Sequence, residues 1–416
     1  MSGAVSQSGR KSAVHQASGL AARPEVREAL GWFARERRWI DEQHLELCRV
    51  PAPTFREDKR AAWFLSRFKD FGWQARLDRA GNVTALPAGD PGGPLVAITA
   101  HLDTVLAPEG ASAVRLEAGR FRGAGVADNG PGLAALLALA RLYSEFPGLA
   151  GETPAPLLAA NVCEEGEGNL SGMRYLCRQS PLVPRLAAFL VLDGPATDHI
   201  TAEALACRRF EIQLTGPGGH SWSDHGTVNP VHALSRAISD FVDLRWDSPD
   251  ATPRCSYNFG VVEGGSTVNS IPSAASARAD LRSEDPALLD EMAAQLTRTV
   301  EHAVTVENDR ASGGRLAARI RETGSRPGGR LPEGSPLLEA VRGVDEFLGI
   351  RSSLDCASTD ANVPLSLGLP AVSLGAGGQG GGAHTPGEWY SSEGRDLGLR
   401  RLLLTHLLLA RTAGPV

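Results

Sequence analysis

The stretch LVAITAHLD, residues 95–103, places a run of apolar and small residues directly before His101 and Asp103. A short apolar run of this kind is typical of a strand that is buried on both faces. Residues i and i+2 of a strand face the same side, so Asp103 can hold the ring of His101 in one orientation and one tautomer. Open α/β sheets keep their binding sites at the carboxyl ends of such strands. The stretch therefore predicts an α/β fold with a site at the end of this strand.

Strand-like runs and helical patterns alternate after this stretch, which is typical of a mostly parallel sheet covered by helices. The expected strands are 95–100, 156–162 and 187–192, and the expected helices are 132–146 and 170–178. Residues 25–49 and 56–71 also carry helical patterns. We therefore expect an α/β fold in the first half of the chain.

The pattern changes near residue 201 and returns near residue 324. Between these positions, polar and apolar residues alternate over 208–214, and amphipathic helices are expected at 229–244 and 286–306. Strands at 256–262 and 274–281 complete an antiparallel α+β module. We predict a flexible tail at 1–21, a catalytic domain at 22–203 and 324–416, and an inserted domain at 204–323. The second part of the catalytic domain has a helix at 336–348, a strand at 371–374 and a helix at 397–411.

Composition limits the kinds of partner. A chain of 416 residues is too long for one compact core, and a net charge of −6 argues against nucleic acid. The six cysteines show no C-x-x-C spacing, which indicates reduced thiols in a cytoplasmic protein. The first 16 residues lack the apolar core of a signal peptide, and the apolar runs 133–140 and 402–410 are too short to span a membrane. We expect neither a nucleic-acid nor a membrane partner.

Further acidic and imidazole groups follow other predicted strands: Asp128, Glu164, Glu165, Asp193 and His384. Each has an ordinary structural explanation when taken alone. Asp128 could cap a helix, the glutamates could be solvated, Asp193 could form a turn, and His384 could lie in a loop. Together they place several metal-binding groups at the ends of neighbouring elements, and this predicts a metal site.

The chain resembles the M20 family of dinuclear zinc peptidases and amidohydrolases, over roughly residues 40–410. Relatives in this family include peptidase T, glutamate carboxypeptidases, acetylornithine deacetylase and succinyl-diaminopimelate desuccinylase. The resemblance depends on seven ordered motifs: AHLDTV (100–105), GVADNG (125–130), CEEGEG (163–168), LDG (192–194), GPGGHS (216–221), GGSTVNSIP (264–272) with ADLR (279–282), and AHTPGEW (383–389).

The resemblance implies a zinc-exopeptidase-like catalytic domain that holds two Zn²⁺ ions per chain, with Co²⁺ or Mn²⁺ as possible replacements. It assigns His101 and Asp193 to one ion, Glu165 and His384 to the other, and Asp128 to both. A site with open positions of this kind is catalytic rather than structural.

The resemblance also assigns roles around the metals. Glu164 matches the general base, and Asp103 matches the carboxylate that supports His101. His220 matches the histidine that stabilises the oxyanion, which in dimeric relatives reaches the site of the neighbouring subunit. Asn269 and Arg282 match substrate-contacting positions of the lid, and the less favoured alternative is a strand-edge residue and a surface arginine.

The implied function is zinc-dependent hydrolysis of an amide bond, with a small peptide as substrate. Peptidase relatives tend to carry an aspartate at the position of Asp193, whereas deacylase relatives tend to carry a glutamate. Deacylation or desuccinylation of an N-acyl amino acid is the first alternative, and an inactive binding protein on the same fold is the second. A homodimer through the inserted lid domain is also implied.

Two positions depart from the family pattern. Cys163 stands where many relatives have an aspartate, and Asn129 stands where they often have an acidic or longer side chain. Neither position is expected to supply a metal ligand. We therefore expect altered rather than lost activity.

Overall fold

The structure is a computed structural model that describes residues 2–90, 92–107, 113–151, 154–246 and 253–412. The chain divides into two compact units. The first unit comprises Met1–Ala204 and Arg330–Val416, and the inserted unit comprises Leu205–Gly329. Within the described ranges, no helix combines the length and apolar character needed to cross a membrane.

The first unit is built on a mixed sheet whose centre is parallel. Its strand order is β1-β2-β6-β3-β7-β17-β8-β15, and β16 pairs with β8. The parallel centre consists of β6 (Ala155–Asn161), β3 (Leu95–His101), β7 (Leu186–Leu192) and β17 (Ala371–Leu374). The remaining strands are β1 (Gln74–Leu77), β2 (Val83–Leu86), β8 (His199–Ala204), β15 (Gly329–Arg330) and β16 (Ser353–Ala357). The prediction of a mostly parallel sheet is confirmed for this centre.

The central strands end at one edge of the sheet, because they run in the same direction. Every residue of β3, β6 and β17 is buried, as their apolar sequences predict. The register joins Thr99 of β3 to Ala159 of β6 and to Val191 of β7. The segments after these strands therefore start close together.

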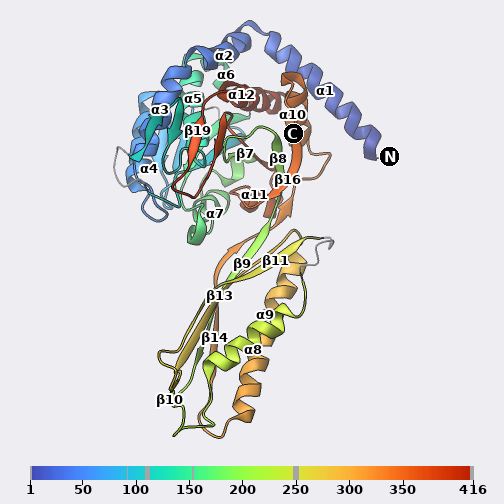
Figure 1. Ribbon diagram of the computed structural model, residues 1–416. Coiled ribbons are helices and arrows are strands. Elements are labelled where there is room, and N and C mark those ends of the chain that lie inside the picture. Colours follow the sequence, from blue (N-terminus) through green and yellow to red (C-terminus); the bar gives the residue numbers. More distant parts are fainter. Residues whose placement is uncertain (1, 91, 108–112, 152–153, 247–252, 413–416) are drawn as a thin grey trace. The chain divides into compact units, whose positions relative to one another are not determined.

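Helices surround this sheet (Figure 1). They are α1 (Ser2–Ala22), α2 (Pro24–Arg35), α3 (Arg37–Arg49), α4 (Asp58–Asp70), α5 (Gly130–Glu145), α6 (Pro147–Ala150), α7 (Ser171–Arg178), α10 (Pro336–Leu348), α11 (Asn362–Ser366) and α12 (Arg395–Thr412). A separate small sheet has the order β18-β19-β5-β4. Its strands are β4 (Arg115–Glu117), β5 (Arg120–Arg122), β18 (Gln379–Gly381) and β19 (Trp389–Ser391). Short 3₁₀ turns occupy Gly166–Gly168 and Val183–Arg185.

The predicted flexible tail at 1–21 is wrong, because residues 2–22 form helix α1. Ala13, Ala17 and Leu20 are buried and lie on one face of that helix. A Cβ atom added to Gly343 of α10 would lie 2.5 Å from the Cβ of Ala13, so the two helices touch closely. The contact is made by small residues, which produce only a weak hydrophobic periodicity, and for this reason the sequence did not predict the helix.

The inserted unit is an antiparallel sheet that packs against two helices (Figure 1). The strand order is β11-β13-β9-β14, with β9 (Ala206–Thr215), β11 (Cys255–Gly264), β13 (Ala274–Ser283) and β14 (Ala317–Arg326). The helices are α8 (Pro230–Val242) and α9 (Pro286–Arg310), and β10 (Gly219–His220) pairs with β12 (Ser270–Ile271). The predicted α+β module is confirmed. Because β14 pairs along β9, the unit extends beyond the predicted end at 323.

Candidate metal centre

The ring of His101 lies at the end of β3 and is 2% exposed. Its Nδ1 lies 3.0 Å from the backbone carbonyl of Asp103 and 3.5 Å from the carboxylate of that residue. Its Nε2 lies 3.9 Å from Oδ2 of Asp128. Burial alone would lower the pKa of His101, but the bond to Asp103 and the charges of Asp128 and Glu164 raise it well above its usual value. One ring nitrogen is therefore held by Asp103 and the other faces acidic groups.

The carboxylate of Asp103 also binds two backbone amides, which the sequence analysis did not predict. Its Oδ1 accepts a hydrogen bond from the amide of Glu164 and its Oδ2 from the amide of Glu165, both at 2.9 Å. The hydroxyl of Thr54 also donates to Oδ2 at 2.9 Å. Asp103 is fully buried, and these bonds fix the turn after β6 to the end of β3.

A second buried carboxylate holds the start of the same turn. Oε1 of Glu57 accepts bonds from the amide of Cys163 at 3.0 Å and from its thiol at 3.3 Å. Cys163 has φ of 58°, a left-handed conformation that non-glycine residues adopt rarely. Burial raises the pKa of the Cys163 thiol to about 11, which keeps it neutral. Glu57 and Asp103 together fix the backbone that carries Glu164 and Glu165.

The side chain of Asp128 lies in the loop before α5. Its backbone is tied to the segment after β7, because the amide of Gly194 donates to the Asp128 carbonyl at 3.1 Å. Asp193 precedes Gly194, and its own amide donates to Leu374 at the end of β17 at 3.1 Å. These bonds place Asp128 and Asp193 at the same edge of the sheet.

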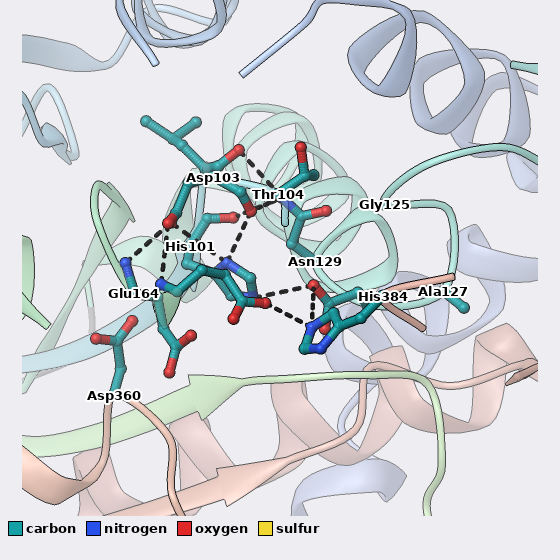
Figure 2. Close-up of polar contacts among 12 residues, drawn as sticks. His101, Asp103, Thr104, Gly125, Ala127, Asn129, Glu164, Asp360 and His384 are labelled. Carbon is teal, nitrogen blue, oxygen red and sulfur yellow. Dashed lines mark hydrogen bonds and ion pairs between the residues drawn. The ribbon is translucent and has the colours of Figure 1, made fainter. Parts of the chain in front are cut away.

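Three overlapping clusters of possible metal ligands occur among the described residues, and Figure 2 shows His101, Glu164 and His384 among them. They are His101–Asp128–Asp193, His101–Glu164–Glu165 and Asp128–Glu165–His384. In each cluster the donor atoms lie within 4.8 Å of one another. The structure thus brings together all five predicted metal ligands, and Asp128 belongs to two of the clusters.

His384 approaches its cluster from the other end of the sequence. Its Nε2 lies 2.7 Å from Oε1 of Glu165 and 3.6 Å from Oδ2 of Asp128. The contact with Asp128 raises the pKa of His384 to about 9. Burial raises the pKa of Glu165 to about 7, and the charge of Asp128 adds to this shift. The carboxylates beside His384 therefore favour a positive charge at this place.

The donor set fits divalent transition metals. Imidazole nitrogens with carboxylate oxygens are ligands for zinc, and they also suit cobalt and manganese. Glu164, Glu165 and Asp128 bring negative charge into a space with little exposure to solvent. A bound cation relieves the repulsion between such carboxylates.

Two predicted residues of the inserted unit lie together. His220 pairs with Ser270 in the β10–β12 ladder, and the amide of Ser221 donates to the carbonyl of Asn269 at 3.0 Å. The ring of His220 is exposed, and its Nδ1 accepts bonds from the amides of Trp222 at 3.2 Å and Ser223 at 3.3 Å. These bonds leave Nε2 as the ring atom that points away from the turn.

Arg282 lies elsewhere in the inserted unit. It follows Ala274, the first residue of β13, by eight residues, which is about 27 Å along a strand. Its Nε donates to Asp280 at 2.7 Å. The structure does not bring Arg282 to His220 and Asn269 within this unit.

The supporting roles of other residues of the site escaped the sequence analysis. Nδ2 of Asn129 donates to the carbonyls of His101, Leu102 and Asp103 at 3.2, 3.1 and 2.8 Å. Its position directly after Asp128 is the sequence feature that could have pointed to this role. Asp360 is 2% exposed, contacts Asn161 at the end of β6, and is drawn among the site residues in Figure 2. No pattern in the sequence linked Asp360 to the site.

The carboxylate of Glu388 was also missed. It accepts three backbone bonds in the loop before Asp128, from Gly125, Ala127 and Asp128. Its place in the AHTPGEW motif, shortly after His384, was a signal that could have found it.

Comparison with known proteins agrees with this geometry. Residues 208–306 match the M20 model described as a peptidase dimerisation domain, and residues 82–210 match the model of peptidase family M28. These matches make the chain similar to M20 peptidases over the inserted unit and to M28 peptidases over part of the first unit. The predicted resemblance is therefore confirmed.

Solved structures and curated relatives resemble this chain over different lengths. The aminopeptidase PepT of Bacillus cereus has a TM-score of 0.71 at 20% identity, covering 89% of this chain and 98% of its own. A dinuclear metal-binding peptidase of the M20 family from Bacillus subtilis has a TM-score of 0.66 at 14% identity, covering 90% and 98%. These likenesses show the fold.

A succinyl-diaminopimelate desuccinylase of Legionella pneumophila is 26% identical over 197 residues, which cover 43% of this chain and 51% of the relative. The chain thus spans about half the length of that curated relative.

Proposed function

We propose that this chain hydrolyses the peptide bond of small peptides with two zinc ions. The observation that carries the proposal is the sharing of Asp128 between His101–Asp128–Asp193 and Asp128–Glu165–His384. Two ligand sets that share one carboxylate suit a pair of ions about 3.5–4 Å apart, as in two-metal aminopeptidases. The match to the M20 peptidase dimerisation domain supports the same reaction class.

The first set would hold one ion and the second set the other. When bound, these ions acidify a water molecule and polarise the carbonyl of the scissile bond. Glu164 lies in a cluster with His101 and Glu165 and is 5% exposed, so its carboxylate can take the proton of the attacking water. The same carboxylate then passes the proton to the leaving amine. Asp103 serves this step by fixing the backbone amide of Glu164.

His220 and Asn269 are the proposed contributions of the inserted unit. His220 would donate a hydrogen bond from Nε2 to the oxyanion of the tetrahedral intermediate, a contact worth about 3–4 kcal/mol in comparable sites. Asn269 is joined to the same hairpin through Ser221. Arg282 remains a proposed substrate contact, for which its bidentate guanidinium suits a carboxylate.

A deacylase is the second candidate function. The desuccinylase relative favours it, because that relative's name describes an N-succinyl amino acid derivative as substrate. The aspartate at position 193 and the fold of the aminopeptidase PepT favour a peptidase. We therefore place peptides first and N-acyl amino acids second.

Assembly and location are also proposals. The match of residues 208–306 to a peptidase dimerisation domain supports a homodimer through the inserted unit. All six cysteines are free, which supports a reducing, cytoplasmic setting.

The test combines metal analysis with a substrate screen. Protein purified without chelator should contain about two equivalents of zinc, cobalt or manganese per chain, and should cleave di- or tripeptides faster than N-acetyl or N-succinyl amino acids. Less than one equivalent of metal and no turnover would favour an inactive binding protein.

Glu164→Gln should lower kcat by about 10²–10⁴-fold and leave the metal bound. Glu167→Gln is the matched control, because Glu167 is exposed in the same turn. Full activity in the Glu164 variant would contradict the proposed base.

A further inference from the structure

We propose that Glu388 is a positioning residue that locks Asp128 and His384 into one arrangement and so sets the affinity for the second metal ion. The inference rests on the proposed two-metal centre. It assigns Glu388 to the cluster Asp128–Glu165–His384, while the cluster around His101 is held by other bonds.

The side chain of Glu388 joins two segments that are far apart in the sequence. It is 2% exposed. Oε1 accepts bonds from the amides of Ala127 at 2.7 Å and Asp128 at 3.0 Å, and Oε2 accepts from Gly125 at 2.8 Å. Bonds from amides to a buried carboxylate are charge-assisted and stronger than neutral ones. The backbone before Asp128 is therefore shaped around this carboxylate.

The main chain of Glu388 strengthens the same connection. Its carbonyl accepts a bond from the amide of Gly123 at 3.3 Å. Adding a Cβ to Gly125 would bring it to 2.7 Å from Oδ1 of Asn129, so this loop has little room to shift. A change at Glu388 would thus be transmitted to Asp128 rather than absorbed nearby.

A compact turn links Glu388 to His384. The amide of Glu388 donates to the carbonyl of Thr385 at 3.2 Å, and the Thr385 amide donates to Gly382 at 3.1 Å. The hydroxyl of Thr385 also donates to the Gly382 carbonyl at 2.7 Å. His384 itself has φ of 64° and a side chain that is 48% exposed. Besides its contacts with Glu165 and Asp128, the position of this ring depends on the turn that ends at Glu388.

The other cluster has its own attachment. Asn129 ties the Asp128 loop to the three carbonyls at the end of β3, and the amide of Gly194 binds the Asp128 carbonyl. These bonds attach Asp128 near His101 and Asp193 through groups other than Glu388. Losing the Glu388 carboxylate should therefore weaken the second ion selectively.

Two substitutions give a graded test. Glu388→Gln can keep the acceptor for Ala127 and Asp128, but its amide nitrogen would face the donor of Gly125. Glu388→Ala removes all three side-chain acceptors. Glu307→Gln is the matched control, because Glu307 is also buried and accepts a backbone bond from Asn229 at 3.0 Å in the inserted unit.

The experiment is a titration of the full-length, metal-depleted protein with Co²⁺, followed by visible absorption and equilibrium dialysis. The wild type and Glu307→Gln should bind two ions. Glu388→Gln should bind the first ion unchanged and the second about tenfold more weakly, and Glu388→Ala should weaken the second further. Equal binding of both ions in the Glu388 variants, or equal weakening of both, would overturn the inference. A wild type that binds fewer than two ions would instead overturn the proposed function.

Amide hydrogen exchange of the metal-free protein tests the hydrogen bonds between Glu388 and the loop before Asp128. The amides of Gly125, Ala127 and Asp128 should exchange faster in Glu388→Gln than in the wild type, while protection in β3 stays the same. Unchanged exchange at these three amides would overturn the inference even if metal binding were altered.

Discussion

Oδ1 of Asp103 accepts a hydrogen bond from the backbone amide of Glu164 at 2.9 Å, which joins the end of β3 to the turn after β6. The bond connects two strands that lie side by side in the parallel centre of the sheet. Metal ligands depend on such supporting bonds for their orientation. The position of the proposed base is therefore set by a carboxylate that also touches His101.

Asp103→Asn should disturb this connection. The amide nitrogen of the new side chain would face one of the two backbone donors, so one hydrogen bond is lost in a fully buried place. We expect a 10- to 100-fold loss in metal affinity or in kcat/KM, measured by dialysis and by steady-state kinetics. Asp285→Asn should change neither, since Asp285 caps α9 in the inserted unit. Wild-type values in the Asp103 variant would refute the supporting role.

Stability at acid pH should depend on His406. This residue is fully buried in α12, with Nδ1 2.7 Å from the Tyr143 hydroxyl and Nε2 3.2 Å from the Pro154 carbonyl. Burial lowers its pKa to about 4. Above its usual pKa of about 6.5 the ring is neutral in both states. Between that value and about 4 the unfolded chain takes up a proton that the native chain does not, so the free energy of unfolding falls, by about 3 kcal/mol in all.

Urea unfolding of His406→Gln at pH 7 and pH 5, with chelator present, measures this effect. The variant should be less stable than the wild type at pH 7, and the difference should shrink by about 2 kcal/mol at pH 5. His302→Gln is the control, because His302 is exposed on α9 and should leave the pH dependence unchanged. A difference that is the same at both pH values would show that His406 takes up its proton in the native state.

Two glycines test whether α1 packs against α10. Gly343→Ala should lower the free energy of unfolding by about 1–2 kcal/mol, because the new Cβ would meet Ala13 at 2.5 Å and its backbone at 2.9 Å. Gly19→Ala should instead raise it by up to about 1 kcal/mol, because nothing lies within 4 Å of that position on α1. Urea unfolding measures both. Stabilisation by both substitutions would mean that α1 does not rest on Gly343.

Mixing two inactive variants tests whether His220 acts on the site of a neighbouring subunit. His220→Ala and Glu164→Ala should each lose activity, since one lacks the oxyanion donor and the other the base. If His220 acts in the partner's site, a mixed dimer has one complete site and the mixture should regain activity. Native mass spectrometry of the mixture shows whether subunits exchange. No recovery in freely exchanging dimers would place His220 in the site of its own chain.

The parallel centre of the fold could be predicted because its strands are buried on both faces. The apolar runs before His101, Glu164 and Asp193 marked β3, β6 and β7 within a residue or two. Parallel strands end at one edge of the sheet, so the sequence alone could predict that the ligands following these strands lie close together. Assigning them to two ions still needed the family resemblance.

Other features depend on contacts that the sequence does not encode locally. β14 is mostly exposed and lacks the alternation that marked β9. Helix α1 is held by small residues against Gly343. Asn129 and Glu388 act on backbone groups, and such partners become visible only when distant segments meet. Their residue types alone carried no sign of this role.

Anomalous diffraction at the zinc edge, from crystals grown with zinc, tests the central claim most directly. We predict two peaks less than about 4 Å apart, one in contact with His101 and Asp193, the other with Glu165 and His384, and both with Asp128. A single peak, or no peak at these residues, would contradict the two-metal centre.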